Sequence, residues 1–208
     1  MKKIIGFTLL LVVGMIYIFP VHAANRVSRN HDFDLDDINE LEINNSVGSI
    51  EMRIGDDDEL HVDIDIESGD DGFFRRGKDV DDIDLDIRRR GDKLILTIDE
   101  DNIKADWYIE LPALNAIDID MGVGELDIEI GASSLAIDLG VGEIDVLAPL
   151  ASTGDIEISA GVGDTTIRGI NSVENKRSFV SSKSEGRGEG ELSIDVEVGV
   201  GDVTVSLD

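Results

Sequence analysis

Ile117-Asp-Ile-Asp-Met-Gly-Val-Gly-Glu-Leu-Asp-Ile-Glu-Ile130 is the stretch of this sequence that decides the fold. Apolar and polar residues alternate along it, which is the pattern of a strand buried on one face. Related stretches return at Leu135 to Ala148, Ile156 to Gly169 and Ile194 to Leu207, and each has a central Gly-Val-Gly. Helical spacing of apolar residues is absent after Ala23. The recurrence predicts an all-β chain built from stacked repeats.

The Gly-Val-Gly segment is predicted to be a bend between two strands. When the copies are aligned on their glycines, an apolar column precedes the segment and another follows it, with an odd number of steps between them. Strict alternation would therefore turn one column away from the core. Glycine accepts positive φ and tolerates bulges and sharp bends, so the bend keeps both columns inside. The columns are Met121, Leu139, Ala160 and Val198, and then Leu126, Ile144, Thr165 and Val203.

The spacing of the copies predicts a single-domain β-solenoid with coils of about 19 residues each. The first glycines stand at 122, 140, 161 and 199, so the intervals between them are 18, 21 and 38, the last being twice 19. An earlier, degenerate copy from Leu41 to Ile54 has Ser46 in place of the first glycine, and 122 minus 46 is 76, or four times 19. Coils stacked about 4.8 Å apart would place matching residues above one another. The alternative is an antiparallel meander or sandwich in which each Gly-Val-Gly is a hairpin turn.

Residues 1–23 are predicted to be a cleavable signal peptide. Lys2 and Lys3 precede an apolar run from Ile4 to Phe19, and Val21-His-Ala23 follows as a small-residue cleavage site. A retained membrane anchor is the competing interpretation. Residues 24–208 would then form the β-solenoid domain, located in the periplasm or outside the cell, with loop excursions near 68–79 and 174–190, where the alternation breaks down. The sequence has no Cys, so disulfides and lipoprotein attachment are excluded.

The net charge of −28 limits the classes of partner. Nucleic acids and anionic lipid surfaces repel such a chain, and we expect no stable membrane insertion after signal cleavage. Acidic chains are often disordered, but those are poor in aliphatic residues. Here Ile, Val and Leu alternate with the acids, so the charge is expected on the outer face of a folded domain.

The sequence resembles a known family, most strongly from Trp107 onward. Trp107-Tyr-Ile-Glu-Leu-Pro112, then Ala116-Ile-Asp-Ile-Asp, then alternating stretches punctuated by Gly-x-Gly and an acidic residue resemble the bacterial putative adhesin family of domains of unknown function. The resemblance covers roughly Leu41 to Leu207. It implies a β-solenoid-like fold and an adhesin-like role, and it implies no catalytic residues.

An acidic residue follows every Gly-Val-Gly. In a stack, Glu125, Glu143, Asp164 and Asp202 would form a column that could recruit Ca²⁺ or Mg²⁺, or that could simply be a solvated face. No calcium-binding repeat or EF-hand loop accompanies it: the stretch from Asp99 to Ile103 lacks the required glycine and terminal Glu. We therefore assign no metal, catalytic or cofactor-binding residues.

A few other residues stand out against the acidic background. Arg88-Arg-Arg90 either offsets the nearby Asp81, Asp82, Asp84 and Asp86 or contacts a partner, and Phe73-Phe-Arg-Arg76 lies in the first excursion. The mature chain has two histidines, His31 and His61, and no His pair at zinc-ligand spacing. One of Trp107 and Tyr108 is expected in the core and the other at the surface.

The sequence thus predicts an exported, non-enzymatic β-solenoid that acts as an adhesin-like surface or envelope scaffold. The expected partner is a protein or glycan at the cell envelope, and end-to-end self-association is possible because a solenoid ends in unpaired edges, with Val203 to Leu207 at one of them. Two alternatives remain open: a polysaccharide-active β-helix enzyme, and a structural protein that binds divalent cations.

Overall fold

The computed structural model describes residues 26–69 and 80–208, and all regular secondary structure in them is β. The all-β prediction is confirmed. The predicted signal peptide and the Phe73–Arg76 segment lie outside the described residues. One mixed sheet contains the thirteen strands. They are β1 (Arg26–Asp34), β2 (Glu40–Ile54), β3 (Glu59–Ser68), β4 (Asp86–Arg90), β5 (Lys93–Ile98), β6 (Ile103–Leu111), β7 (Ala116–Glu129), β8 (Ser134–Ala148), β9 (Thr153–Val162), β10 (Thr165–Arg168), β11 (Val173–Arg177), β12 (Ser182–Arg187) and β13 (Leu192–Leu207).

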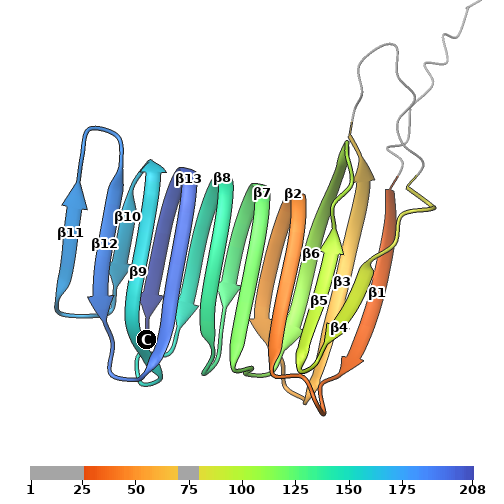
Figure 1. The fold of residues 1–208 in the computed structure, drawn as a ribbon, viewed down its shortest axis with the longest axis horizontal. Coiled ribbons are helices and arrows are strands. Elements are labelled where there is room, and N and C mark those ends of the chain that lie inside the picture. The colour runs from red at the N-terminus through yellow and green to blue at the C-terminus, as the bar shows by residue number, and fades with distance from the viewer. Residues whose placement is uncertain (1–25, 70–79) are drawn as a thin grey trace, which may run out of the picture.

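The sheet folds into two layers because its four longest strands, β2, β7, β8 and β13, bend at their centres (Figure 1). We call the layer of the first halves layer A and that of the second halves layer B. At two places, two separate strands take the place of one bent strand. β5 lies in layer A and β6 in layer B beside the two halves of β2, and β9 and β10 lie in the same way beside the two halves of β13. Layer A runs β4-β5-β2-β7-β8-β13-β9-β12-β11, and layer B runs β1-β3-β6-β2-β7-β8-β13-β10.

The bent strands pair in parallel and in register, as the repeat predicted. Met121 pairs with Leu139, which also pairs with Val198, and Val198 pairs with Ala160. The second column is likewise aligned through Leu126, Ile144, Val203 and Thr165. All members of both columns are buried, so both predicted columns are confirmed.

The bend reverses the alternation where two glycines allow it. Met121 and Leu126 are both buried, whereas Val123 between them points to solvent. Gly124 has φ +159°, and a Cβ there would lie 1.8 Å from the carbonyl oxygen of Gly48 on β2. Only glycine lets the neighbouring bends approach so closely. The prediction that the bend absorbs a flip of face is confirmed.

The spatial order of the strands differs from their order along the chain. The prediction that the intervals of 38 and 76 residues span two and four coils is therefore wrong. β2 lies between β6 and β7, and β13 lies between β8 and β9. Val47 pairs directly with Val123, although the spacing of the copies placed four coils between them. Val162 likewise pairs directly with Val200, where two coils were expected. The strands formed between these partners, β3 to β6 in one case and β10 to β12 in the other, are added at the two ends of the stack, so the two longer intervals do not count coils.

The segment at 174–190, predicted as a loop excursion, forms most of the hairpin of β11 and β12, which pairs with β9 in layer A. Its inner side is polar, and the hydroxyl of Thr165 lies 2.7 Å from those of Ser182 and Ser184. Serine replaces the aliphatic side chains of the repeat, so the alternation was hard to see in the sequence. Val203 to Leu207 also differs from prediction, because it lies inside layer B between β8 and β10 and is not an open edge.

The core between the layers consists almost entirely of aliphatic side chains, with Trp107 as its largest member. Trp107 is 2% exposed and Tyr108 is 40% exposed, which confirms that one lies inside and the other outside. Asn45 occupies a core position beside the break between β5 and β6. Its side-chain amide donates a hydrogen bond of 3.1 Å to the carbonyl of Ala105.

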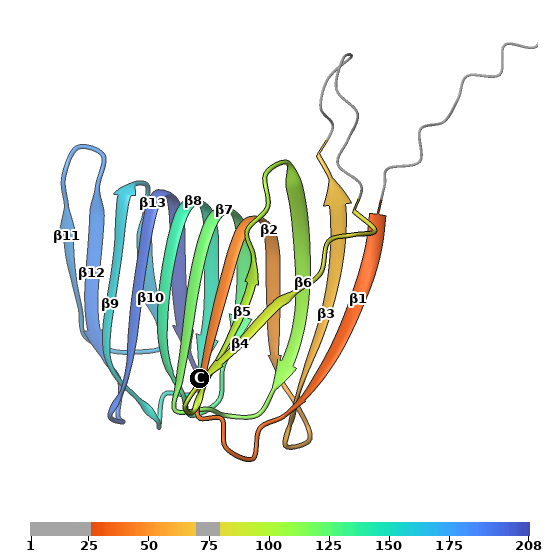
Figure 2. The ribbon, with the colours of Figure 1, turned by 45° about the vertical axis from the view of Figure 1, so that its right-hand side comes forward.

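The two packed layers are compatible with the sandwich alternative, although the Gly-Val-Gly segments are bends within single strands and not hairpin turns. Antiparallel strands are confined to the ends: β4, β3 and β1 at one end, and β12 and β11 at the other. Figure 2 shows the first of these ends, where β4 and β5 belong to a different layer from β6, β3 and β1. Within the described residues, no helix reaches the length and hydrophobicity that a bilayer span requires.

Candidate functional site

The predicted acidic column exists on the layer B side of the bends. Glu125 pairs with Glu143, and Glu143 pairs with Asp202. Asp164 follows Asp202 in space, and its backbone N–H donates a hydrogen bond of 2.8 Å to the carboxylate of Asp202. The column therefore runs Glu125, Glu143, Asp202, Asp164, with its last two members in reverse chain order.

The column carries no metal-binding geometry in the part of the chain that the structure describes. No group of three or more His, Cys, Asp or Glu residues there could hold a metal ion. Asp164 forms an ion pair with Arg177 of β11. By contrast, none of the ion pairs among the described residues involves Glu125, Glu143 or Asp202.

The sequence analysis missed a row of exposed valines along the bends. Each bend has valine at its centre, with 41–47% of the residue exposed. Strand pairing aligns these residues, so they form one continuous row that we call the valine ridge. In spatial order the ridge contains Val47, Val123, Val141, Val200 and Val162. The constant central residue of Gly-Val-Gly was visible in the sequence, but its exposure was not.

A shallow groove lies between the valine ridge and the acidic column. Val123 and Val141 line one side of it, and Glu125, Glu143 and Asp202 line the other. Its volume is ≈ 380 Å³. The second glycines of the bends form the floor, because they have no side chains to fill it.

A second acidic row borders the ridge on the layer A side. It consists of Asp120, Asp138 and Glu197, which are exposed and aligned by the pairing of β7, β8 and β13. Burial, followed by the neighbouring negative charges of Asp138 and Asp118, raises the pKa of Asp120. Burial disfavours the charged form of the carboxyl group, and the like charges beside it add to this effect.

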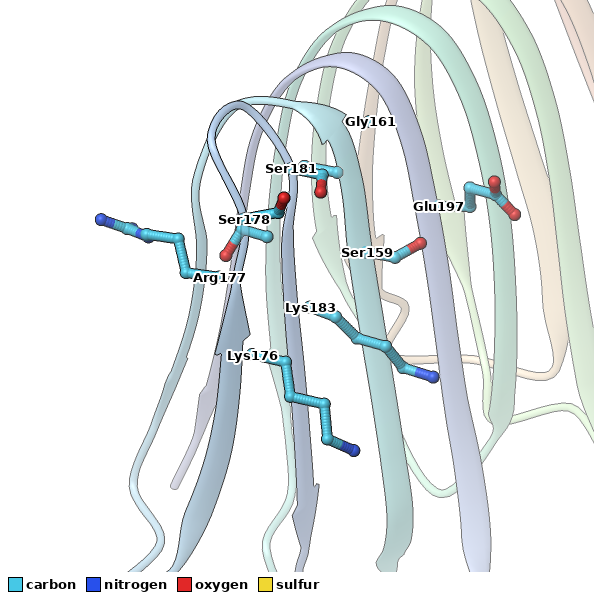
Figure 3. A pocket seen from close by; sticks show the side chains of 10 residues that line it. Ser159, Gly161, Lys176, Arg177, Ser178, Ser181, Lys183 and Glu197 are labelled. Atoms are coloured by element: carbon cyan, nitrogen blue, oxygen red, sulfur yellow. The ribbon is translucent and has the colours of Figure 1, made fainter.

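The β11–β12 hairpin carries the main group of cations near the bends. Figure 3 shows Lys176 and Lys183 beside the hollow that Ser159 and Glu197 also line, and Arg177 pointing away from them. Lys183 contacts Glu157 at 2.7 Å and Glu185 at 3.0 Å, and these contacts raise its pKa. These cations are therefore already paired with carboxylates of the protein.

The far end of the stack holds the histidines and the arginine run. Arg88 pairs with Asp86, which fits the first of the two interpretations of the run, whereas Arg89 pairs with Asp37, 3.6 Å away. His31 lies 3.7 Å from Asp84. These residues lie on or beside β1, β3 and β4, on the far side of β2 from the strands β7, β8 and β13, so the structure does not combine them with the acidic column.

His61 is expected to stabilise the fold at neutral pH and to lose this contribution as the pH becomes alkaline. Hydrogen bonds to Asp32 at 2.7 Å and to Asp57 at 3.1 Å raise the pKa of His61 to about 9. Because the folded pKa exceeds the unfolded value of about 6.5, the stabilisation is full below that value and is lost as pH rises through about 9. Chemical denaturation of wild type and His61→Gln should give a stability difference that shrinks between pH 7 and 10. A nuclear magnetic resonance titration of His61 with a midpoint near 6.5 would contradict this expectation.

Comparisons with known proteins relate the chain to others through its fold. No protein-family model matches it, and neither does any curated protein. Among solved structures, it is similar to a putative cell adhesion protein from Clostridium sporogenes ATCC 15579, with a TM-score of 0.53 and 14% identity over 88% of this chain and 100% of the other. A putative adhesin from Bacteroides fragilis NCTC 9343 matches with a TM-score of 0.31 and 12% identity, over 88% and 97% of the two chains. The first likeness shows a shared fold, and the second is too distant in structure to carry an argument.

Proposed function

We propose that this chain, which shares its fold with a bacterial protein named for cell adhesion, is an exported, non-enzymatic interaction protein of the cell envelope. In this proposal the parallel two-layer units form a short β-solenoid, which is a rigid scaffold for an outer binding surface. The observation that carries the proposal is the distribution of side chains: aliphatic residues fill the interior, and carboxylates recur at the outward positions on both sides of each bend in β7, β8 and β13.

The electrostatics support binding in preference to catalysis. Acid–base hydrolysis of a glycan needs one carboxyl group whose pKa is raised in an apolar pocket beside an ionised partner. Asp120 has a raised pKa and lies beside Asp138, but both are exposed on the outer side of layer A. A substrate bound at these two carboxylates would be exposed to solvent and surrounded by further carboxylates, and no apolar pocket would enclose it.

Retention of envelope material by the purified protein tests this proposal. Residues 24–208 would be immobilised on beads and incubated with envelope fragments of the source bacterium. An unrelated acidic protein of similar size and charge serves as the control. We expect several-fold more retained envelope protein or glycan than on the control beads, and no shortening of uronic acid polymers in the same incubation. Equal retention on both beads would contradict an interaction role, and polymer shortening would favour the polysaccharide-active alternative.

The divalent-cation alternative has a separate readout. If cations stiffened the stack, Ca²⁺ would raise the unfolding temperature of the purified domain, because a ligand that binds only the folded state stabilises it. We expect an unchanged midpoint in calorimetry with and without Ca²⁺.

A further inference from the structure

The valine ridge is apolar at positions that the bends turn towards solvent, where the fold does not require an apolar side chain. Each valine stands at the top of a bend, outside both layers, with nearly half of its surface in contact with solvent. The five positions are aligned across neighbouring strands, so the ridge is about 19 Å long at the usual strand spacing. Aligned exposed aliphatic groups of this kind mark interaction sites more often than isolated ones do.

Negative charge on both sides of the ridge indicates the chemistry of a partner that would cover it. We call the two flanking rows the acidic rails: Asp120, Asp138 and Glu197 on layer A, and Glu125, Glu143 and Asp202 on layer B. None of the ion pairs among residues 26–69 and 80–208 involves any of these six carboxylates. Elsewhere on the same surface, Asp164 and Glu157 pair with cations of the hairpin. The centre of the ridge, at Val123, Val141 and Val200, is thus apolar between two unneutralised anionic rows.

We propose that the bend edge centred on Val123, Val141 and Val200 binds a cationic, amphipathic polypeptide segment of a partner protein. Aliphatic side chains of the segment would cover the ridge, and its Lys and Arg side chains would reach the rails on either side. The inference rests on the proposed interaction function and specifies its surface and partner chemistry.

Other occupants fit this surface less well. Nucleic acid and anionic lipid would meet the rails with like charge. A neutral glycan would normally use exposed aromatic rings as a stacking platform, and the groove beside the ridge is lined only by valine, glycine and acidic residues. A polypeptide supplies aliphatic and cationic groups together at short spacing, which matches a ridge with flanking rails.

A synthetic peptide of alternating Lys and Leu, labelled with a fluorophore, tests the inference by anisotropy. We expect saturable binding to residues 24–208 in about 50 mM salt and weaker binding in about 500 mM salt, because screening reduces the attraction of the exposed rails. A Glu and Leu peptide of equal length should not bind. If wild type fails to bind the Lys and Leu peptide, this inference is overturned, while the bead experiment still decides the broader proposal.

Matched variants separate the ridge and rails from a general attraction to an acidic protein. Glu143→Gln with Glu197→Gln removes two rail charges from β8 and β13. Asp145→Asn with Asp195→Asn removes two exposed charges from the same strands, one outward position farther from the ridge. We expect the rail variant to bind about tenfold more weakly and the control within about twofold of wild type. Equal losses in both would overturn the inference.

The apolar contribution has its own pair of variants. The triple variant Val123→Ser, Val141→Ser, Val200→Ser should bind the peptide at least about tenfold more weakly than wild type. The control variant Ile54→Ser, Ile87→Ser, Leu147→Ser changes side chains that are exposed elsewhere on the surface, and it should bind nearly as tightly as wild type. Unfolding midpoints of all variants would be measured first. A serine ridge that binds as tightly as wild type would overturn the inference.

Discussion

Gly142→Ala is expected to destabilise the protein by more than about 4 kcal/mol, or to prevent folding altogether, although it adds one methyl group at the surface. Gly142 has φ +154°, a conformation that L-residues with side chains rarely adopt. A Cβ at this position would lie 1.7 Å from the carbonyl oxygen of Gly124 on the neighbouring strand. Relief requires the two backbones to separate, and the pairing of β8 with β7 and β13 opposes that.

Gly91→Ala is the matched control for this prediction. Gly91 also has positive φ, +67°, but no atom lies within 4 Å of the place that a Cβ would take. It should therefore cost only the local conformational penalty of about 1 kcal/mol. Urea unfolding of both variants gives the comparison. Similar losses of stability would mean that backbone conformation alone, and not the close stacking of the bends, makes glycine necessary.

Replacing β13 with a flexible Gly and Ser linker of equal length is expected to detach β9, β10 and the hairpin from the rest of the sheet. β13 lies between β8 on one side and β9 and β10 on the other. Its buried side chains contribute on the order of 10 kcal/mol by apolar burial. They are Ile194, Val196, Val198, Val203, Val205 and Leu207.

Hydrogen exchange gives the readout, and the hairpin supplies the control. Without β13, the amides of β10 should lose protection, because β13 is the only strand with which β10 pairs among the described residues. The amides between β2 and β7 should stay protected. Replacing residues 173–188, which are equally many and include the edge strands β11 and β12, should leave β10 protected. Loss of β10 protection in both variants would contradict a linking role for β13.

The sequence was sufficient to predict the local features of the fold. Alternation identified the strands and their buried faces, as Met121 and Leu126 show, because burying a row of aliphatic side chains is favourable wherever that strand lies. Glycine at 124 predicted a bend for a similar reason: positive φ and close backbone approach are properties of a single position. The separation of Trp107 from Tyr108 followed from the same alternation.

The neighbours of each strand could not be predicted in this way. Every copy of the repeat presents the same register of apolar residues and glycines, so β8 could pair equally well with β9 or with β13 as far as local pattern is concerned. In the structure β13 takes that place, and β2 is inserted in the same manner beside β7. The sequence also concealed the hairpin, because Ser182 and Ser184 are buried through hydrogen bonds to Thr165 rather than through apolar contacts.

Only part of the candidate site could be predicted from the sequence, because the sequence does not show which strands are neighbours. The carboxylates after each Gly-Val-Gly were predicted as a column, since their spacing from the glycines is constant. Their order, the pairing of Asp164 with Arg177, and the exposure of Val141 depended on which strands came together. By itself, then, the sequence determined strands, bends and inward faces, because these depend on contacts within a few residues. Only the tertiary structure decided the order of the strands in the stack and the surface along its bends. The repeats are locally interchangeable, so their order depends on the connecting segments and on the strands that cover the two ends of the stack.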